Sequence, residues 1–445
     1  MNIKSDSRKV EKGDTFIALN YVNDGHKYID DAIKNGATKI IAERGLYSVD
    51  TLIVNNTHDY LVKYLKDNYK EELSDLKIIG MTGTNGKTTT CYLIHKALND
   101  LGEKCAYIGT IGFYINEKIK DLNNTTPDIL DLYEMLLFSK KEGCKYVVME
   151  VSSHALAMNR VSGLEFDYAI FSNLTRDHLD YHETMENYLE EKIKLFNMLK
   201  TKKTAILNID SPYFKDFALE ENNNISYGFN KCAYQITDYH ISLKESIFTV
   251  NNEQYSTKLI GKHNIYNLLC VIILLKEIGF SIDSIKKEIS ILECPRGRME
   301  KIDYNDNLII VDYAHTPDAV SNVIDSVKEL NADNIYTIIG CGGNRDKKKR
   351  PIMAGIATSK SDYCIFTSDN PRFEDPNDII NDMIEKLDKT NYEIEINRVK
   401  AINRGIQLLN KNDILLVLGK GHETYQIIGD KKIDMDDKEI ILSSI

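Results

Sequence analysis

Short apolar stretches alternate with helical patterns from the start of the chain. Residues 15–19 and 39–43 are apolar runs typical of strands, and the apolar positions of 28–37 recur at helical spacing. Charged residues then accumulate over 63–77, which we interpret as a closing helix and linker. The pattern therefore predicts a small α/β domain over residues 1–75.

The middle of the chain repeats a strand and helix alternation. β-Branched runs at 146–151, 168–174 and 204–209 are separated by helical patterns, as in a parallel α/β sheet. The last such pattern ends near residue 296. We therefore expect a central domain over residues 76–296.

The final third, residues 297–445, repeats one local scheme four times. An apolar strand runs into a polar loop marked by glycine or proline, and a helical pattern follows. These strands with their loops are "LIIVDYAHTP", "IYTIIGCGGNRD", "YCIFTSDNP" and "ILLVLGKGHE". In open α/β sheets, ligands bind outside the carboxyl ends of the strands, so we expect these loops to converge on a ligand.

Composition narrows the class of protein. A chain of 445 residues is too long for one core, and a net charge of -11 argues against a nucleic-acid partner held by phosphate contacts. There is no apolar signal segment and no apolar run long enough to span a membrane. The eight cysteines form no CxxC pair, so we expect a cytoplasmic protein without zinc or disulfides.

The stretch "GMTGTNGKTTT", residues 80–90, lies between a predicted strand and a predicted helix, where a glycine-rich loop can cradle phosphates. Lys87 would reach the β and γ oxygens of a nucleotide, and Thr88 would offer its hydroxyl to Mg²⁺. Met81 replaces the first glycine of the strict Walker spacing, so this is a variant loop. The alternative is a glycine-rich turn with an incidental lysine. The predicted nucleotide-binding residues of this loop are Gly83, Thr84, Asn85, Gly86, Lys87, Thr88 and Thr89.

This loop, together with "MEVSSHAL", "NLTRDHLDYH" and "DYAHTPDAV", resembles the Mur ligases, the ATP-dependent amide-forming enzymes of peptidoglycan synthesis. The resemblance extends from "DSRKVEKGDTFIAL" to "GKGHETYQ". It implies three α/β domains: an N-terminal UDP-sugar-binding domain, a central P-loop ATPase domain and a C-terminal Rossmann-like domain that receives an amino acid. We expect a monomer.

Within the family, the chain is most similar to the members that add the third residue of the peptide. The implied reaction joins meso-diaminopimelate to UDP-N-acetylmuramoyl-L-alanyl-D-glutamate. ATP phosphorylates the γ-carboxylate of the D-glutamyl residue, and an amine attacks the acyl phosphate, releasing ADP and phosphate. Metal ions and basic groups must offset the repulsion between the γ-phosphate and the carboxylate.

The resemblance also implies a catalytic centre. Lys87 would act on the phosphates, while Thr88, Glu150 and His178 would serve Mg²⁺, together with Lys192 carbamylated by CO₂ to N6-carboxylysine. Burial would favour that modification, because it disfavours the ammonium form. The alternatives are ordinary: a capping carboxylate, a hydrogen-bonded histidine, and a lysine on a solvated helix face.

The resemblance assigns two further groups of residues. Those expected to bind the base, ribose and γ-phosphate of the nucleotide are Asn264, Asn267, Arg298, Asp312 and His315. Those expected to bind the UDP-linked peptide are Ser7, Thr125, Thr126, Ser152 and Arg160. Hydroxyls and an arginine are suitable partners for pyrophosphate and carboxylates.

The loops of the C-terminal third determine which amino acid is bound. The residues expected to bind it are Arg345, Asp369, Asn370, Pro371, Arg372, Gly419 and Glu423. In the family, "DNPR" accompanies meso-diaminopimelate. A guanidinium can bind the carboxylate that distinguishes diaminopimelate from lysine, and Glu423 would accept the distal ammonium. Alternatively, Arg372 is a turn residue paired with Glu374 or Asp375.

Three other functions stay open from the sequence. One is a Mur-type paralogue that adds L-lysine or uses an altered sugar nucleotide. Another is a folylpolyglutamate synthetase, although "EVSSH" and "DNPR" speak against it. The last is a nucleotide-binding module without catalysis, against which Lys87, Glu150, His178 and Lys192 argue.

Overall fold

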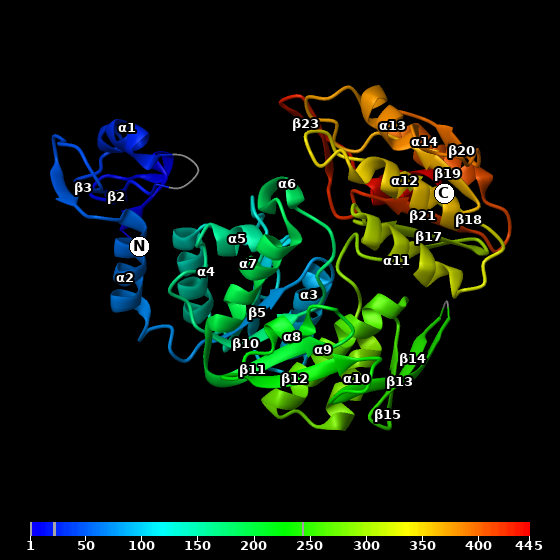
Figure 1. Ribbon diagram of the computed structural model, residues 1–445, viewed down its shortest axis with the longest axis horizontal. Helices are drawn as coiled ribbons and strands as arrows, with labels where there is room; N and C mark the ends of the chain where they lie inside the picture. The colour runs from blue at the N-terminus through cyan, green and yellow to red at the C-terminus, as the bar shows by residue number, and fades with distance from the viewer. Residues whose placement is uncertain (1, 21–23, 243) are drawn as a thin grey trace.

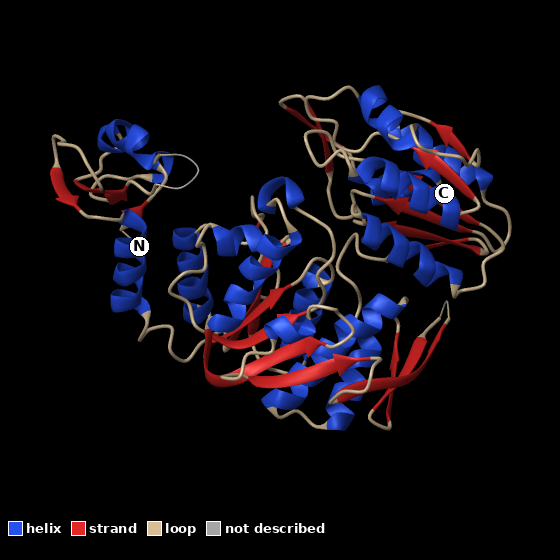
Figure 2. Cartoon of the chain, in the orientation of Figure 1, coloured by secondary structure: helices blue, strands red, loops and turns tan. Residues whose placement is uncertain are grey.

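The chain forms three successive α/β units with a sheet in each (Figure 1). The computed structural model describes residues 2–20, 24–242 and 244–445. Helices flank the sheets in every unit (Figure 2). The α/β class predicted from the sequence is therefore confirmed, with three sheets in the order in which the sequence predicts three domains.

The N-terminal sheet has the order β1-β2-β3-β4 and is parallel throughout. Its elements are β1 (Ile3–Lys4), η1 (Ser7–Lys9), β2 (Thr15–Ile17), η2 (Gly25–Tyr28), α1 (Ile29–Lys34), β3 (Lys39–Ala42), β4 (Asp50–Ile53) and α2 (Thr57–Tyr69). The predicted strands β2 and β3 and helices α1 and α2 are confirmed. Strands β1 and β4 lack a sequence signal because one is two residues long and the other has no buried position.

The central sheet has eleven strands in the order β15-β14-β13-β12-β11-β10-β5-β9-β6-β7-β8. Its strands are β5 (Lys77–Thr82), β6 (Cys105–Gly109), β7 (Gly112–Tyr114), β8 (Lys118–Lys120), β9 (Tyr146–Glu150), β10 (Phe166–Phe171), β11 (Leu199–Asn208), β12 (Asn223–Gly228), β13 (Tyr234–Ile241), β14 (Ser246–Val250) and β15 (Glu253–Thr257). The predicted parallel sheet is confirmed for β5, β6 and β9 to β12. Antiparallel strands extend both edges, which the sequence did not predict.

Helices cover both faces of this sheet because its central strands are apolar on both sides. Val148 and Ile170 pack in the same core as α3 (Lys87–Asp100), α9 (Lys262–Ile278) and α10 (Ile282–Ile291). Val147 and Ala169 face the opposite way, into a core with the remaining helices. Those helices are α4 (Ile129–Lys141), α5 (Ser153–Ala157), α7 (Met185–Asn197) and α8 (Phe214–Phe217), while α6 (Leu179–His182) precedes α7. This alternation is the two-sided burial expected of parallel strands.

The C-terminal sheet has the order β16-β17-β21-β18-β19-β20. Its strands are β16 (Glu300–Tyr304), β17 (Asn307–Asp312), β18 (Ile335–Ile339), β19 (Tyr363–Phe366), β20 (Tyr392–Ile394) and β21 (Ile414–Leu418). The helices are α11 (Pro317–Lys328), α12 (Lys349–Lys360), α13 (Pro376–Ile384), α14 (Arg398–Leu408) and α15 (Asp437–Ser444), and β22 (Tyr425–Ile428) pairs with β23 (Lys431–Asp434). The four predicted strands, β17, β18, β19 and β21, are parallel neighbours, so their following loops leave from one edge.

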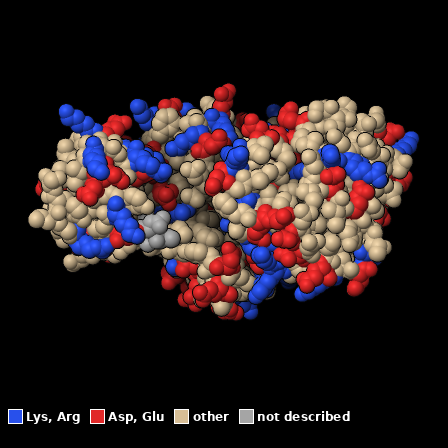
Figure 3. Space-filling view, turned by 90° about the horizontal axis from the view of Figure 1, so that it is seen from above, with Lys and Arg blue, Asp and Glu red and all other residues tan. Residues whose placement is uncertain are grey.

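Polar contacts join neighbouring units. Lys9 Nζ lies 2.7 Å from Asp131 of α4, which connects the N-terminal unit to the central one. Asn85 Nδ2 donates to Asp318 Oδ2 of α11 at 2.8 Å, so the central unit touches the C-terminal one at its glycine-rich loop. Charges of both signs mix over the face seen in Figure 3. No helix in the described part of the chain is long and apolar enough to cross a membrane.

Candidate active site

The glycine-rich loop lies between β5 and α3, as predicted. Gly86 is the residue before α3 and has φ 88°, a conformation that favours glycine. A Cβ on Gly83 would lie 2.0 Å from Ser172 Oγ, so only glycine fits there too. Met81 lies inside β5, fully buried beside Glu150 of β9, and therefore does not shape the loop itself.

The Lys87 side chain curls back over this loop. Its ammonium donates to Gly83 O at 2.8 Å and to Thr84 O at 2.9 Å. Burial lowers the pKa of Lys87, while Glu150 and Asp177 act in the opposite direction. Lys87 thus lies within electrostatic range of an acid at the end of β9 and of another in the loop before α6.

Oxygen ligands gather at the start of α3. Thr88 Oγ1 donates to Glu150 Oε2 at 2.9 Å, and Glu150 Oε1 accepts from Tyr107 Oη at 2.5 Å and Thr110 N at 2.8 Å. Arg298 Nη2 donates to Thr88 Oγ1 at 3.3 Å. A hydroxyl and a carboxylate held beside a phosphate loop are the ligands that Mg²⁺ takes from proteins. The described residues contain no group of three or more His, Cys, Asp and Glu that could hold a metal ion.

Lys192 is buried in the same centre. Its side chain lies on α7 with 1 % exposure, and Nζ donates to Gly83 O at 2.8 Å. Burial, reinforced by Lys87, lowers the pKa of Lys192 well below its usual range. Lys194 instead pairs with Glu191 at the surface. The structure therefore separates these two lysines on physical grounds.

His178 precedes α6 with φ 55°, in the left-handed region. Its ring lies 4.8 Å from that of His154, and Nε2 lies 3.3 Å from Asp177 Oδ2. Burial lowers the pKa of His178, with Asp177 opposing it. The imidazole is therefore neutral at pH 7, which is the form that binds metals. No hydrogen bond between the described residues joins it to Glu150.

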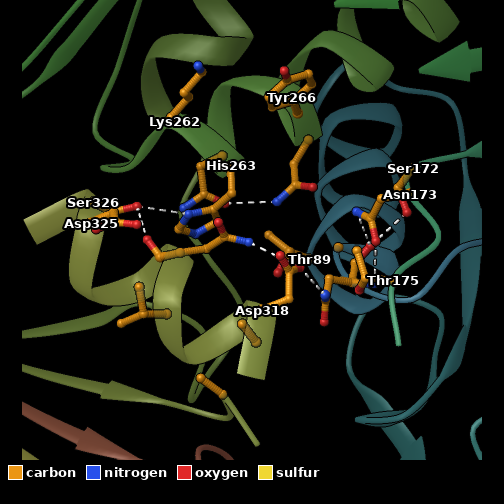
Figure 4. Close-up of a pocket in the computed structure, with 18 of the residues that line it drawn as sticks. Thr89, Ser172, Asn173, Thr175, Lys262, His263, Tyr266, Asp318, Asp325 and Ser326 are labelled. Atoms are coloured by element: carbon orange, nitrogen blue, oxygen red, sulfur yellow. Dashed lines mark hydrogen bonds between the residues drawn. The ribbon is translucent and has the colours of Figure 1, made fainter. Parts of the chain in front are cut away.

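A cavity of about 500 Å³ opens beside the glycine-rich loop, between α9 and α11 (Figure 4). Asn264 and Asn267 line it from one side of α9, and Asn267 Nδ2 donates to Asn264 Oδ1 at 2.9 Å. Thr90 Oγ1 donates to Asn267 Oδ1 at 3.0 Å, which fixes that amide. This volume is typical of sites for small ligands such as nucleotides.

The C-terminal unit supplies the opposite wall. Arg298 lies over the Tyr313 ring at 4.5 Å, and Asp312 Oδ2 accepts from Met299 N at 2.7 Å. Burial raises the pKa of Asp312, and burial lowers the pKa of His315 to about 4. The structure thus places eight of the predicted nucleotide residues around one cavity: Asn85, Gly86, Thr89, Asn264, Asn267, Arg298, Asp312 and His315. The other four, Gly83, Thr84, Lys87 and Thr88, belong to the adjoining loop and do not line the cavity. Sequence reasoning missed Lys262, Tyr266 and Asp318, which also line it.

Four of the five residues expected to bind the UDP-linked peptide are close together. Thr126 Oγ1 donates to Glu150 O at 2.8 Å and to Ser152 Oγ at 3.3 Å. Thr125 Oγ1 lies 3.1 Å from Thr110 Oγ1, and Arg160 Nη1 donates to Thr126 O at 3.1 Å. The fifth, Ser7, lies apart in η1 of the N-terminal unit, and no hydrogen bond in the described residues links it to the others.

The loops after β18, β19 and β21 form what we call the acceptor cluster: Arg345, Asp369, Asn370, Arg372, Gly419, Lys420 and Glu423. Asn370 Nδ2 donates to Glu423 Oε2 at 2.8 Å. A Cβ on Gly419 would lie 2.7 Å from Asp369 Oδ2, so those two loops also touch. Pro371 O approaches Gly343, which brings the "DNPR" loop against the loop after β18. The predicted convergence of these loops is therefore present.

Arg372 has an unusual local environment. Its φ is 54°, its N–H donates to Ile427 O at 3.0 Å, and its Nη1 donates to Gly343 O at 3.0 Å. No carboxylate of the described residues pairs with its guanidinium. Glu374 pairs instead with Arg350, at 3.0 Å, and Asp375 caps α13. The alternative of an Arg372 turn pair with either acid is therefore wrong.

Comparison with known proteins identifies the family. The models of the Mur ligase middle domain and of the Mur ligase glutamate ligase domain match residues 81–275 and 297–421. The chain belongs to the Mur ligase family. This Mur ligase is 43% identical to UDP-N-acetylmuramoyl-L-alanyl-D-glutamate--2,6-diaminopimelate ligase of Fusobacterium nucleatum, over 98% of the chain and 92% of the relative. It is 39% identical to the ligase of the same name from Clostridium perfringens, over 99% and 94%.

Among solved structures, a protein titled UDP-N-acetylmuramoyl-L-alanyl-D-glutamate--2,6-diaminopimelate ligase aligns with a TM-score of 0.71 and 33% identity. The alignment covers 100% of this Mur ligase and 94% of that chain. The three-domain fold implied by the sequence is therefore confirmed. As a member of this family, the protein is an ATP-dependent enzyme that forms amide bonds.

Proposed function

We propose that this Mur ligase joins meso-diaminopimelate to UDP-N-acetylmuramoyl-L-alanyl-D-glutamate in peptidoglycan synthesis. The observation that carries the proposal is Arg372, whose guanidinium has no carboxylate partner among the described residues and lies in the same cluster as Asn370 and Glu423. A guanidinium left without an acid favours a ligand that brings its own carboxylate. The named relatives support the same substrates.

The first step transfers the γ-phosphoryl group of ATP to the γ-carboxylate of the D-glutamyl residue. Asn264 and Asn267 would contact the base, and Asp312 and His315 the ribose and nearby phosphates. Lys87 would leave the carbonyls of Gly83 and Thr84 for the phosphate oxygens, which are stronger acceptors because they are charged. Mg²⁺ held by Thr88 and Glu150 would neutralise charge on the phosphates.

Lys192 suits carbamylation. In its neutral form, which burial favours by lowering the pKa of Lys192, the amine can add CO₂, forming an N–C bond and releasing one proton, and the resulting carbamate would be anionic. The amine is already 2.8 Å from Gly83 O of the phosphate loop, so the new oxygens would lie beside the catalytic centre. We propose that His178, neutral and on the adjacent loop, serves the same metal centre.

The second step forms the amide. The amine of the acceptor attacks the acyl phosphate, phosphate leaves, and the amine loses its proton. Arg372 and Arg345 would bind a carboxylate of diaminopimelate, while Glu423 and Asp369 face its ammonium groups. We further propose that residues 1–75 bind the UDP-sugar, 76–296 bind ATP and 297–445 bind the amino acid. The cytoplasmic location and the monomeric state expected from the sequence stay predictions.

Parallel reactions test the function. The protein is incubated with ATP, Mg²⁺ and the UDP-linked dipeptide, together with either meso-diaminopimelate or L-lysine. The masses of the products are then determined by mass spectrometry. We expect the diaminopimelate tripeptide and hardly any lysine product. Preferred incorporation of lysine would contradict the proposal, and ATP hydrolysis without either tripeptide would indicate a different acceptor.

A further inference from the structure

One lysine ammonium is enclosed within the acceptor cluster. Lys420 follows β21, and its side chain has 0% exposure. Lysine is almost never fully buried unless it is paired. Lys420 Nζ lies 3.0 Å from Glu423 Oε2 and donates to Asn370 Oδ1 at 3.3 Å. The cation therefore contacts two residues that we propose face the acceptor.

This contact orients both neighbours. Asn370 Oδ1 accepts from Lys420 and, at 2.9 Å, from Ile427 N, so its amide nitrogen is turned towards Glu423. Glu423 Oε2 takes hydrogen bonds from Asn370 and Lys420, whereas Oε1 receives none from the described residues. One carboxylate oxygen is thus occupied internally, and the other is available to a ligand.

The charges of the acceptor cluster do not cancel. Its cations are Arg345, Arg372 and Lys420, and its carboxylates are Asp369 and Glu423. A Cβ on Gly342 would lie 3.0 Å from Arg372 Nη1 and 3.8 Å from Arg345 Cγ, so both arginines lie over the same loop. Arg398 nearby is neutralised by Asp437 at 2.7 Å, with both side chains fully buried. An excess of one positive charge remains.

We propose that Lys420 determines the specificity of the acceptor site: its ammonium cancels the charge of Glu423, so the site selects an amino acid of zero net charge over a cationic one. The inference rests on the proposed function. Diaminopimelate carries two ammonium groups and two carboxylates near neutral pH, whereas L-lysine carries two ammonium groups and one carboxylate. Repulsion of the extra positive charge is stronger in this partly buried site than in water.

Lys420→Met tests this idea, because it removes the charge and keeps an unbranched side chain. The ratio of kcat/KM for meso-diaminopimelate to that for L-lysine is measured with ATP and the UDP-linked dipeptide. We expect the ratio to fall about tenfold, mainly because L-lysine is used better. The KM for ATP should not change, since the nucleotide cavity is lined by other residues. An unchanged ratio in the folded variant overturns the inference.

Lys432→Met is the matched control. Lys432 on β23 lies over the ring of Tyr425 at 3.7 Å, and Lys420 lies over the same ring at 5.6 Å. Lys432 is exposed and forms no ion pair with the acids of the acceptor cluster in the described residues. We expect its ratio to equal that of the wild type. A similar fall in both variants would show a general charge effect and overturn a specific role for Lys420.

Glu423→Gln is a second test, and it does not depend on whether Lys420→Met folds. It leaves the cluster with two excess positive charges, so the ratio should rise above that of the wild type. The variant also loses the contact between Glu423 and a substrate ammonium group. Diaminopimelate and L-lysine both carry two ammonium groups, so this loss affects the two substrates equally and cancels in the ratio of their kcat/KM values. A fall, or no change, contradicts the inference.

The double variant Lys420→Met with Glu423→Gln restores the original charge excess, and its ratio should return towards the wild-type value. A ratio equal to that of Lys420→Met alone would overturn the charge mechanism. The wild-type reactions separate this inference from the proposed function. If the wild type joins neither amino acid to the dipeptide, both the proposed function and this inference are wrong. If the wild type prefers diaminopimelate and Lys420→Met prefers it equally, only this inference is wrong.

Discussion

The catalytic centre and the acceptor cluster hold their lysine side chains in different ways. Lys192 is buried and Lys87 is half-buried, and both donate to the carbonyl of Gly83 instead of to an acid. In the acceptor cluster, Lys420 is paired with Glu423, while the Arg372 guanidinium donates to the carbonyls of Gly343 and Asn370. Cations held by backbone oxygens can be transferred to an anionic substrate at little cost, because no buried acid is left alone. Lys87 and Arg372 can therefore each turn to an anionic ligand, whereas Lys420 is fixed on Glu423.

Lys87→Ala should have the largest effect. Removing the cation that would contact the β and γ phosphates is expected to lower kcat/KM by about 1,000-fold. Product formation is measured with saturating amino acid, with Lys96→Ala on the same helix as control, since Lys96 pairs with Asp100 towards solvent. Activity close to that of the control would mean that the phosphates lie elsewhere.

Lys192→Ala is expected to lower kcat by about 100-fold or more, because the carbamate would stabilise charge next to the phosphates. Lys194→Ala, two residues away and paired with Glu191 at the surface, should be nearly unchanged. Carbamylation itself is checked by ¹³C NMR with labelled bicarbonate. A carbamate signal should be present in the wild type and in Lys194→Ala but absent from Lys192→Ala; its persistence there would place the modification on another amine.

Arg372→Ala should weaken the preference for diaminopimelate over L-lysine without affecting phosphoryl transfer from ATP. Losing two charge-assisted hydrogen bonds is expected to raise the KM for diaminopimelate about 100-fold, with the KM for ATP unchanged. Arg404→Ala is a suitable control, because Arg404 pairs with Glu393 at the surface of the same unit. Retained discrimination against L-lysine in Arg372→Ala would show that another group reads the carboxylate.

Glu374→Gln tests the support of the "DNPR" loop and has the smallest expected effect. Hydrogen bonds from Arg350 lower the pKa of Glu374 from 4.5 to about 2. A depressed carboxyl pKa stabilises the folded state above the unfolded value, and this stabilisation is lost as pH falls from 4.5 towards about 2. We expect the variant to lose about 2 kcal/mol of unfolding free energy at pH 7 and almost nothing near pH 2.

Urea unfolding at several pH values measures this difference. Glu385→Gln, an exposed residue at the end of α13, is the control and should follow the wild type throughout. A Glu374→Gln deficit that stays constant from pH 7 to pH 2 would show that the carboxylate charge is not the cause.

The sequence determined the elements whose signals are local. Strands β5, β9 and β10 each contain a run of consecutive apolar residues, and the glycine-rich loop is one contiguous motif, so its place between β5 and α3 could be predicted. The "DNPR" and "GKGHE" loops could also be placed at strand ends, because the apolar runs before them are unambiguous. Strands β13 to β15 were not predicted, because their alternating apolar and polar residues differ from the continuous apolar runs of the parallel strands, and they pair antiparallel with one another.

The tertiary structure decided which charges have partners. Lys192 and Lys194 share one helix and look alike in sequence, but only the fold buries the first against Gly83, 109 residues away. Arg372 is two residues from Glu374 and three from Asp375 in sequence, yet Glu374 pairs with Arg350 of α12. Lys420 is enclosed because three loops close around it. Burial and pairing depend on residues distant along the chain, and therefore no local pattern can report them.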